Sequence, residues 1–141
     1  MQRIFLTRLY TTFSKSNFEP IKVTDNAWNK IGNILKIQSN NWGFLFSAEG
    51  GGCGGFNYSF KTIDYDKYNK IFDKSKIKPS IINNDNNKII IDPYSEMFLL
   101  GTTIDYVKED YNKNIFESKF IFIPDKNLAT TCGCGVSFNP K

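Results

Sequence analysis

The chain has 141 residues, with 18 basic and 14 acidic side chains, a net charge of +4, three cysteines and no histidine. This length suits one compact domain, and a hydrophobic content of 40% is that of a globular protein. The absence of histidine excludes Ser-His-Asp and Cys-His catalysis and histidine-ligated zinc. We therefore expect no enzyme, and any metal site must use sulfur, carboxylate or carbonyl ligands.

The positive charge is concentrated at the N-terminus. Residues 1–18 hold Arg3, Arg8 and Lys15, many hydroxyl side chains and no acid. This composition is typical of a mitochondrial transit peptide, although a flexible N-terminus without a targeting role is the alternative. The sequence thus predicts a removed leader over 1–18, a domain over 19–141 and a location in the mitochondrial matrix.

The remaining sequence argues against two classes of partner. Both arginines lie in the leader, so the domain lacks the side chain that most often reads guanine or clamps phosphate. No later window is long and apolar enough to span a bilayer. We expect neither nucleic acid nor a membrane as a partner.

The first half of the domain has clear periodicities. Thr24 is a favourable N-cap, and the apolar residues that follow recur at helical spacing, which predicts an amphipathic helix over 25–39 with Trp28 in the core. The apolar run 43–47 predicts a buried strand. Aromatic and polar residues alternate over 56–61, which predicts a half-buried strand.

The second half is expected to be mostly β. Residues 62–88 are rich in Asp, Asn and Lys, and we expect a long, partly irregular and solvated loop there. Strands are predicted over 89–91, 102–107 and 116–123, with a short helix or turn over 94–100. One helix followed by many short strands indicates a mostly-β domain with α decoration, an α+β fold.

All three cysteines are flanked by glycine. Cys53 is enclosed by five glycines, and Cys132 and Cys134 alternate with Gly133 and Gly135. Glycine permits positive φ and close approach of the backbone to a ligand. Thiols that only fill a core more often have apolar neighbours. The pattern therefore favours thiolates that hold something bulky.

The spacing of Cys132 and Cys134 suits shared metal ligation. In an extended segment their Cα atoms would lie about 6–7 Å apart on one face, which is at the limit for a disulfide. Three cysteines without histidine leave a four-ligand thiolate site incomplete. A carboxylate, a small thiol or a second subunit must supply the fourth ligand. Because an open position suits delivery, this argues for a dimer that holds metal at its interface.

These motifs resemble those of the A-type iron–sulfur carrier family (IscA/SufA/HesB type), especially its branch of second mitochondrial IscA homologues. The resemblance covers about 21–138 and rests on the motif 51–56 with Tyr58, on Gly101 with the run 104–107, and on the terminal motif 132–138.

The resemblance implies a compact IscA-like β-sandwich with one N-terminal amphipathic helix. It also implies binding of iron or of an iron–sulfur cluster ([2Fe-2S] and/or [4Fe-4S]) through Cys53, Cys132 and Cys134, and a role in maturing mitochondrial [4Fe-4S] proteins. The implied partners are a second copy or a paralogous A-type carrier, a monothiol glutaredoxin donor, a transformylase-like assembly factor and apo [4Fe-4S] recipient proteins.

Two departures from the family pattern concern loops. More residues separate Cys53 from Cys132 than is usual in the family, and the excess falls mainly in 62–88. The run 123–127 replaces an Asn-Pro-Asn-Ala-like stretch of the family. Both affect loop geometry and partner surfaces rather than the three cysteines.

Other roles remain open for the cysteines and for three further residues. The cysteines could instead form a structural zinc site or redox-active thiols. Glu49, Asp105 and Tyr106 are possible extra ligands, but we expect Glu49 to be a solvated acid and the other two to be structural.

Overall fold

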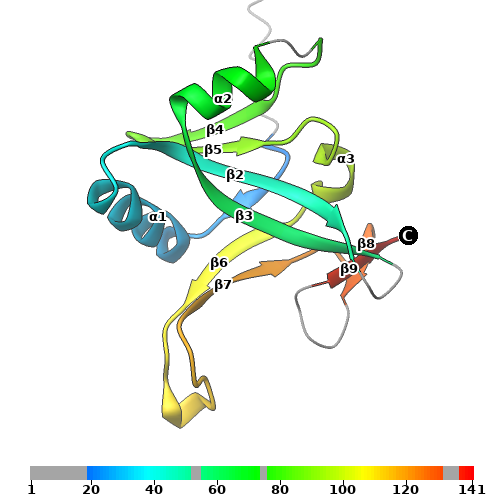
Figure 1. The fold of residues 1–141 in the computed structure, drawn as a ribbon. Helices are drawn as coiled ribbons and strands as arrows, with labels where there is room; N and C mark the ends of the chain where they lie inside the picture. Colours follow the sequence, from blue (N-terminus) through cyan, green and yellow to red (C-terminus); the bar gives the residue numbers. More distant parts are fainter. Residues whose placement is uncertain (1–18, 52–54, 74–75, 132–136) are drawn as a thin grey trace, which may run out of the picture.

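The computed structural model describes residues 19–51, 55–73, 76–131 and 137–141 (Figure 1). Within these residues the elements follow in this order: β1 (Lys22–Val23), α1 (Asp25–Ile37), β2 (Asn41–Gly50), β3 (Phe56–Asp64), α2 (Tyr65–Phe72), β4 (Ser80–Asn84), β5 (Asn87–Ile91), α3 (Glu96–Leu99), β6 (Thr103–Val107), a 3₁₀ turn η1 (Tyr111–Lys113), β7 (Lys119–Ile123), β8 (Ala129–Thr131) and β9 (Ser137–Pro140).

The strands form two sheets that pack face to face. The large sheet has the order β4-β5-β2-β3-β9-β8, and the small sheet has the order β1-β6-β7. Phenylalanine rings join them: Phe46 of β2 lies 5.3 Å from Phe122 of β7, and Phe44 lies 6.1 Å from Phe120. The predicted α+β sandwich is confirmed. Its main core comprises Ile21, Ala27, Ile31, Phe44, Phe46, Tyr58, Ile82, Ile89, Ile91, Leu99, Ile104, Ala129 and Phe138.

Helix α1 is the predicted amphipathic helix, and it ends two residues earlier than expected. The Thr24 hydroxyl accepts a hydrogen bond from the amide of Ala27 at 3.2 Å and donates one to Asp105 of β6 at 2.5 Å. The cap that starts the helix therefore also ties it to the small sheet. Trp28 packs, partly buried, against the main core.

The predicted solvated loop over 62–88 is wrong. Strand β3 continues to Asp64, whose side chain accepts a hydrogen bond from the Lys67 amide at 2.6 Å and starts α2. Strands β4 and β5 then form an antiparallel pair. The few apolar residues here are outnumbered by polar ones, so average composition concealed them. Ile63 and Phe72 join Ile90 of β5 in a second core, with Trp42, Leu45 and Tyr68 packed against it.

Other boundaries differ modestly from the predictions. Strand β2 runs over Asn41–Gly50 rather than 43–47. Strand β7 starts at Lys119 rather than at 116. Before it, Asn114 closes η1 in a left-handed conformation (φ 57°), and Ile115 forms an isolated bridge with Asp110. The β6–β7 hairpin therefore projects from the body as an arm (Figure 1). Among the described residues, no helix has the length and apolar character needed to cross a membrane.

We predict that the second core is a real part of the folding unit. Phe72 is 6% exposed and its neighbour Ile71 is 45% exposed. Phe72→Ala should lower the free energy of unfolding by about 3–5 kcal/mol, the range for a buried phenylalanine. The matched control Ile71→Ala should cost under about 1 kcal/mol in the same urea titration. Equal effects of the two substitutions would contradict the packing.

Candidate functional site

The three predicted ligands, Cys53, Cys132 and Cys134, lie outside the described residues, within 52–54 and 132–136. The site is therefore defined by the strands that lead into and out of these two segments.

Four adjacent strand residues flank both cysteine segments. The registers pair Gly50 of β2 with Phe56 of β3, Phe56 with Phe138 of β9, and Phe138 with Thr131 of β8. Each of the four lies within two residues of a cysteine segment. Neighbouring strands are about 4.8 Å apart. The chain thus enters and leaves both segments across one row of the large sheet, which we call the four-strand row.

Aromatic rings fix this row from the core side. Phe56 stacks on Phe138 with 5.9 Å between ring centroids, and Tyr58 stacks on Phe138 at 4.3 Å. Phe98 of α3 stacks on Phe56 at 4.6 Å. Phe138 is fully buried. Burial of Tyr58 and Phe138 holds the short β8–β9 hairpin against the longer β2–β3 hairpin.

Polar groups link the strands on the opposite face of the row. The Ser137 hydroxyl donates a hydrogen bond to the side-chain oxygen of Asn57 at 2.5 Å. The amide of Gly51 donates to the carbonyl of Gly55 at 2.9 Å, which closes the base of the Cys53 segment. A side chain at Gly55 would collide with Asn139 of β9, so glycine is required for this close approach.

Of the other candidates, Glu49 is a solvated acid and Asp105 and Tyr106 make structural contacts, as predicted. Glu49 is exposed and forms an ion pair with Lys61 at 3.4 Å. Asp105 accepts hydrogen bonds from the Thr24 hydroxyl and the Tyr106 amide. The Tyr106 ring contacts Phe120 at 5.1 Å.

The donor chemistry fits thiolate ligation. Among the described residues, no three cysteine, aspartate or glutamate side chains gather where they could hold a metal ion. The chain contains no histidine. Soft thiolates are the ligands preferred by iron–sulfur clusters, and the thiols of this chain are those of Cys53, Cys132 and Cys134.

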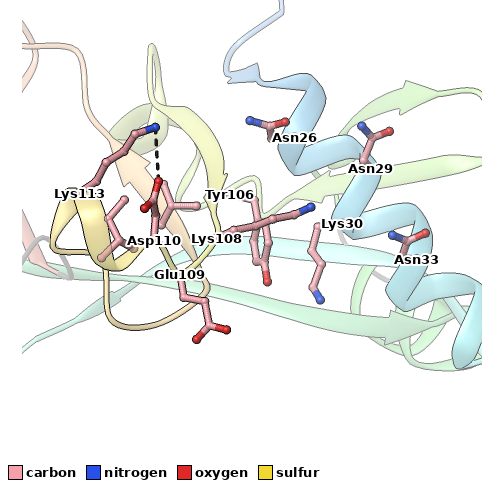
Figure 2. A pocket seen from close by; sticks show the side chains of 11 residues that line it. Asn26, Asn29, Lys30, Asn33, Tyr106, Lys108, Glu109, Asp110 and Lys113 are labelled. Atoms are coloured by element: carbon pink, nitrogen blue, oxygen red, sulfur yellow. Dashed lines mark ion pairs between the residues drawn. The ribbon is translucent and has the colours of Figure 1, made fainter.

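A separate polar pocket escaped the sequence analysis. It has a volume of about 410 Å³ and lies between α1 and the β6–β7 arm (Figure 2). Asn26, Asn29 and Asn33 line it from the helix. On the side of the arm it is lined by Lys113 and Asp110, which form an ion pair at 3.6 Å. Its residues come from segments far apart in sequence, and they form no motif.

Comparison with known proteins assigns the family. Residues 20–136 match the family model for iron–sulphur cluster biosynthesis. The iron-sulfur cluster insertion protein ErpA of Buchnera aphidicola subsp. Cinara cedri is 40% identical over 120 residues, covering 84% of this chain and 95% of the relative. ErpA of Wigglesworthia glossinidia brevipalpis is 39% identical over 120 residues, covering 84% and 92%.

Solved structures share the fold at lower identity. Escherichia coli SufA, involved in biosynthesis of iron-sulfur clusters, superposes with a TM-score of 0.61 at 22% identity, over 84% of this chain and 91% of that one. IscA with the [2Fe-2S] cluster gives a TM-score of 0.58 at 19% identity, over 86% and 97%. The chain belongs to the iron–sulphur cluster biosynthesis family, and its resemblance to the A-type carriers is confirmed.

Tyr58 provides a test of the core beneath the row. Its hydroxyl is buried and forms no well-aligned hydrogen bond within the described part of the chain. Burial raises the pKa of this hydroxyl, and the neighbouring Thr102 side chain partly offsets the shift. An unpaired buried hydroxyl costs stability.

We predict that Tyr58→Phe is neutral or stabilising by about 1 kcal/mol in urea unfolding at pH 7, because it removes that cost. The pKa of Tyr58 is higher in the folded than in the unfolded protein, so the folded state favours the neutral phenol. This favourable effect on the free energy of unfolding is complete below the unfolded pKa of about 10 and is lost as the pH rises through the folded value. Tyr58→Phe should therefore lose less stability than wild type above pH 10.

The matched control is Tyr94→Phe, at a side chain that is 72% exposed. It should follow wild type at both pH values. A clear loss of stability at pH 7 in Tyr58→Phe alone would show that the hydroxyl has a partner.

Proposed function

We propose that this protein carries an iron–sulfur cluster, or iron, as cargo on Cys53, Cys132 and Cys134 and delivers it to recipient proteins. The observation that carries the proposal is the four-strand row, in which Phe56 pairs with Phe138 and Phe138 with Thr131. This register gives the two cysteine segments, distant in sequence, a common base.

The donor set and the relatives support the same chemistry. Thiolates are the natural ligands of such clusters, and the described residues around the row offer no competing metal-binding group. ErpA relatives are named for cluster insertion, and a solved IscA structure contains a [2Fe-2S] cluster. Three thiolates leave one position open, which favours transfer over storage. A second copy, or a paralogous carrier, would then complete the site.

The direct test is anaerobic reconstitution of the full chain with iron and sulfide. Bound iron and acid-labile sulfide are counted, and visible charge-transfer absorption is recorded. Wild type should bind both. Cys132→Ser and Cys134→Ser should each reduce bound cluster by at least about tenfold, because removal of even a supporting group typically lowers metal affinity by about 10–100-fold. Thr130→Ser, a change at an exposed residue of β8, is the matched control.

The outcomes separate the alternatives. Full cluster binding by both Cys132→Ser and Cys134→Ser would overturn the ligand assignment. Colourless protein with tightly held zinc, which unfolds on chelation, would indicate a structural zinc site. Reversible cycling of a Cys132–Cys134 disulfide without metal would indicate a thiol-redox protein.

The setting of this activity is proposed from residues 1–18. We infer that they direct the protein to the mitochondrial matrix and are removed there, because they carry basic and hydroxyl side chains without acid. In that compartment the partners would be a monothiol glutaredoxin as donor, a transformylase-like assembly factor, and apo [4Fe-4S] recipients. The carrier would contribute to their maturation.

We predict that residues 1–18 fused to a fluorescent protein direct it to mitochondria. Arg3→Gln with Arg8→Gln should abolish import, because the positive charge drives presequence uptake. The matched control is Thr11→Ala with Thr12→Ala, which keeps the charge. Cytosolic fluorescence of the unmodified fusion would contradict the assignment, and N-terminal sequencing of imported protein would locate the cleavage site.

A further inference from the structure

We infer that Asn57 and Ser137 form a polar clamp that sets the position of the Cys53 segment relative to the Cys132–Cys134 segment. The two residues are positioning residues for the cargo site. The inference rests on the proposed function for its purpose, but the clamp itself is a property of the unloaded chain.

Asn57 and Ser137 lie opposite each other at the start of two neighbouring strands. Asn57 is the second residue of β3 and Ser137 is the first of β9, and the two are direct cross-strand partners. Their hydrogen bond joins residues 80 positions apart in sequence. Ser137 is 8% exposed, and a buried hydrogen bond resists competition from water.

Asn57 also contacts the base of the Cys53 segment. A Cβ atom at Gly51 would lie 2.5 Å from the side-chain oxygen of Asn57. The Asn57 amide therefore lies directly against the backbone of Gly51, the residue that precedes 52–54. Ser137 is the residue that follows 132–136. One side chain thus touches the residue entering one cysteine segment and the residue leaving the other.

Asn57 has a second cross-strand partner, Glu49 of β2. The Glu49 carboxylate pairs with Lys61 at 3.4 Å and, as an acceptor, has no proton to give to the Asn57 oxygen. That oxygen takes its hydrogen bond from the Ser137 hydroxyl. The aromatic stack of Phe56 and Phe138 acts on the opposite face, so the clamp and the stack hold the two strands from both sides.

Metal sites depend on such supporting groups. Side chains that orient ligands without touching the metal typically change affinity by about 10–100-fold when they are removed. Loss of the clamp would leave the strands in register through their backbones and the stack of Phe56 on Phe138, but held from one face only. We expect the thiols of the two segments to meet less often as a result.

The test uses the full chain without metal and then the reconstituted protein. In the unloaded chain, a short bifunctional thiol reagent reports how often Cys53 meets Cys132 or Cys134, and a monofunctional reagent of similar size corrects for thiol reactivity. In the loaded protein, visible circular dichroism and the rate of cluster loss to a chelator are recorded.

Asn57→Ala and Ser137→Ala should each slow corrected cross-linking and speed cluster loss by about 10-fold or more. Ser137→Thr keeps the hydroxyl and should stay close to wild type. Because both alanine variants remove one shared bond, the double variant should be no worse than either single one.

Ser59→Ala is the matched control, because Ser59 lies on β3, is also 8% exposed and pairs with Ser47 rather than with β9. Unchanged cross-linking in both alanine variants, or an equal change in Ser59→Ala, would overturn the clamp. If Asn57→Ala fails to fold, the contrast between Ser137→Ala and Ser137→Thr still decides.

Failure of the proposed function would look different. Wild type would then bind no cluster, while the difference in cross-linking between Ser137→Ala and Ser137→Thr would persist. A cluster that forms equally well in every variant, with unchanged cross-linking, would overturn the clamp and leave the carrier function intact.

Discussion

The pairing of β3 with β9 is the constraint on which the site depends. It comprises only two residue pairs, Phe56 with Phe138 and Asn57 with Ser137, yet it attaches the C-terminal hairpin to the large sheet. Side chains alternate between faces along a strand, so a slip of one residue would move the fully buried Phe138 to the polar face. Burial of that ring thus specifies the register, and the register brings the bases of both cysteine segments together.

Local patterns made much of the fold predictable. The N-cap at Thr24 and the apolar spacing after it located α1, and aromatic alternation after Phe56 located β3. The prediction for 62–88 failed because polar residues outnumber the apolar ones there, and the burial of Ile63 and Phe72 depends on Trp42 and Ile90 from elsewhere in the chain. The pairing of β3 with β9 could not be predicted for a related reason: it joins segments about eighty residues apart.

Part of the candidate site could likewise be predicted from local sequence, and part could not. The cysteines could be singled out from sequence because glycine surrounds them, which is a local and chemically meaningful pattern. Asn57 and Ser137 could not, since each is an ordinary strand residue until the register places them opposite each other. The pocket between α1 and the β6–β7 arm likewise requires tertiary structure (Figure 2). Candidate ligands can be proposed from a local sequence pattern, whereas the positions of the strands that flank them are a property of the sheet.

The long segment 62–88 lies where it leaves the four-strand row intact. Helix α2 begins after Asp64, at the far end of β3 from Phe56. Strand β3 has nine residues, and at about 3.3 Å per residue its two ends are about 26 Å apart. Helix α2 also packs, through Phe72, on Ile63 and Ile90 in the second core. An insertion that supplies its own buried contacts can lengthen the chain without disturbing the register that the cysteine segments require.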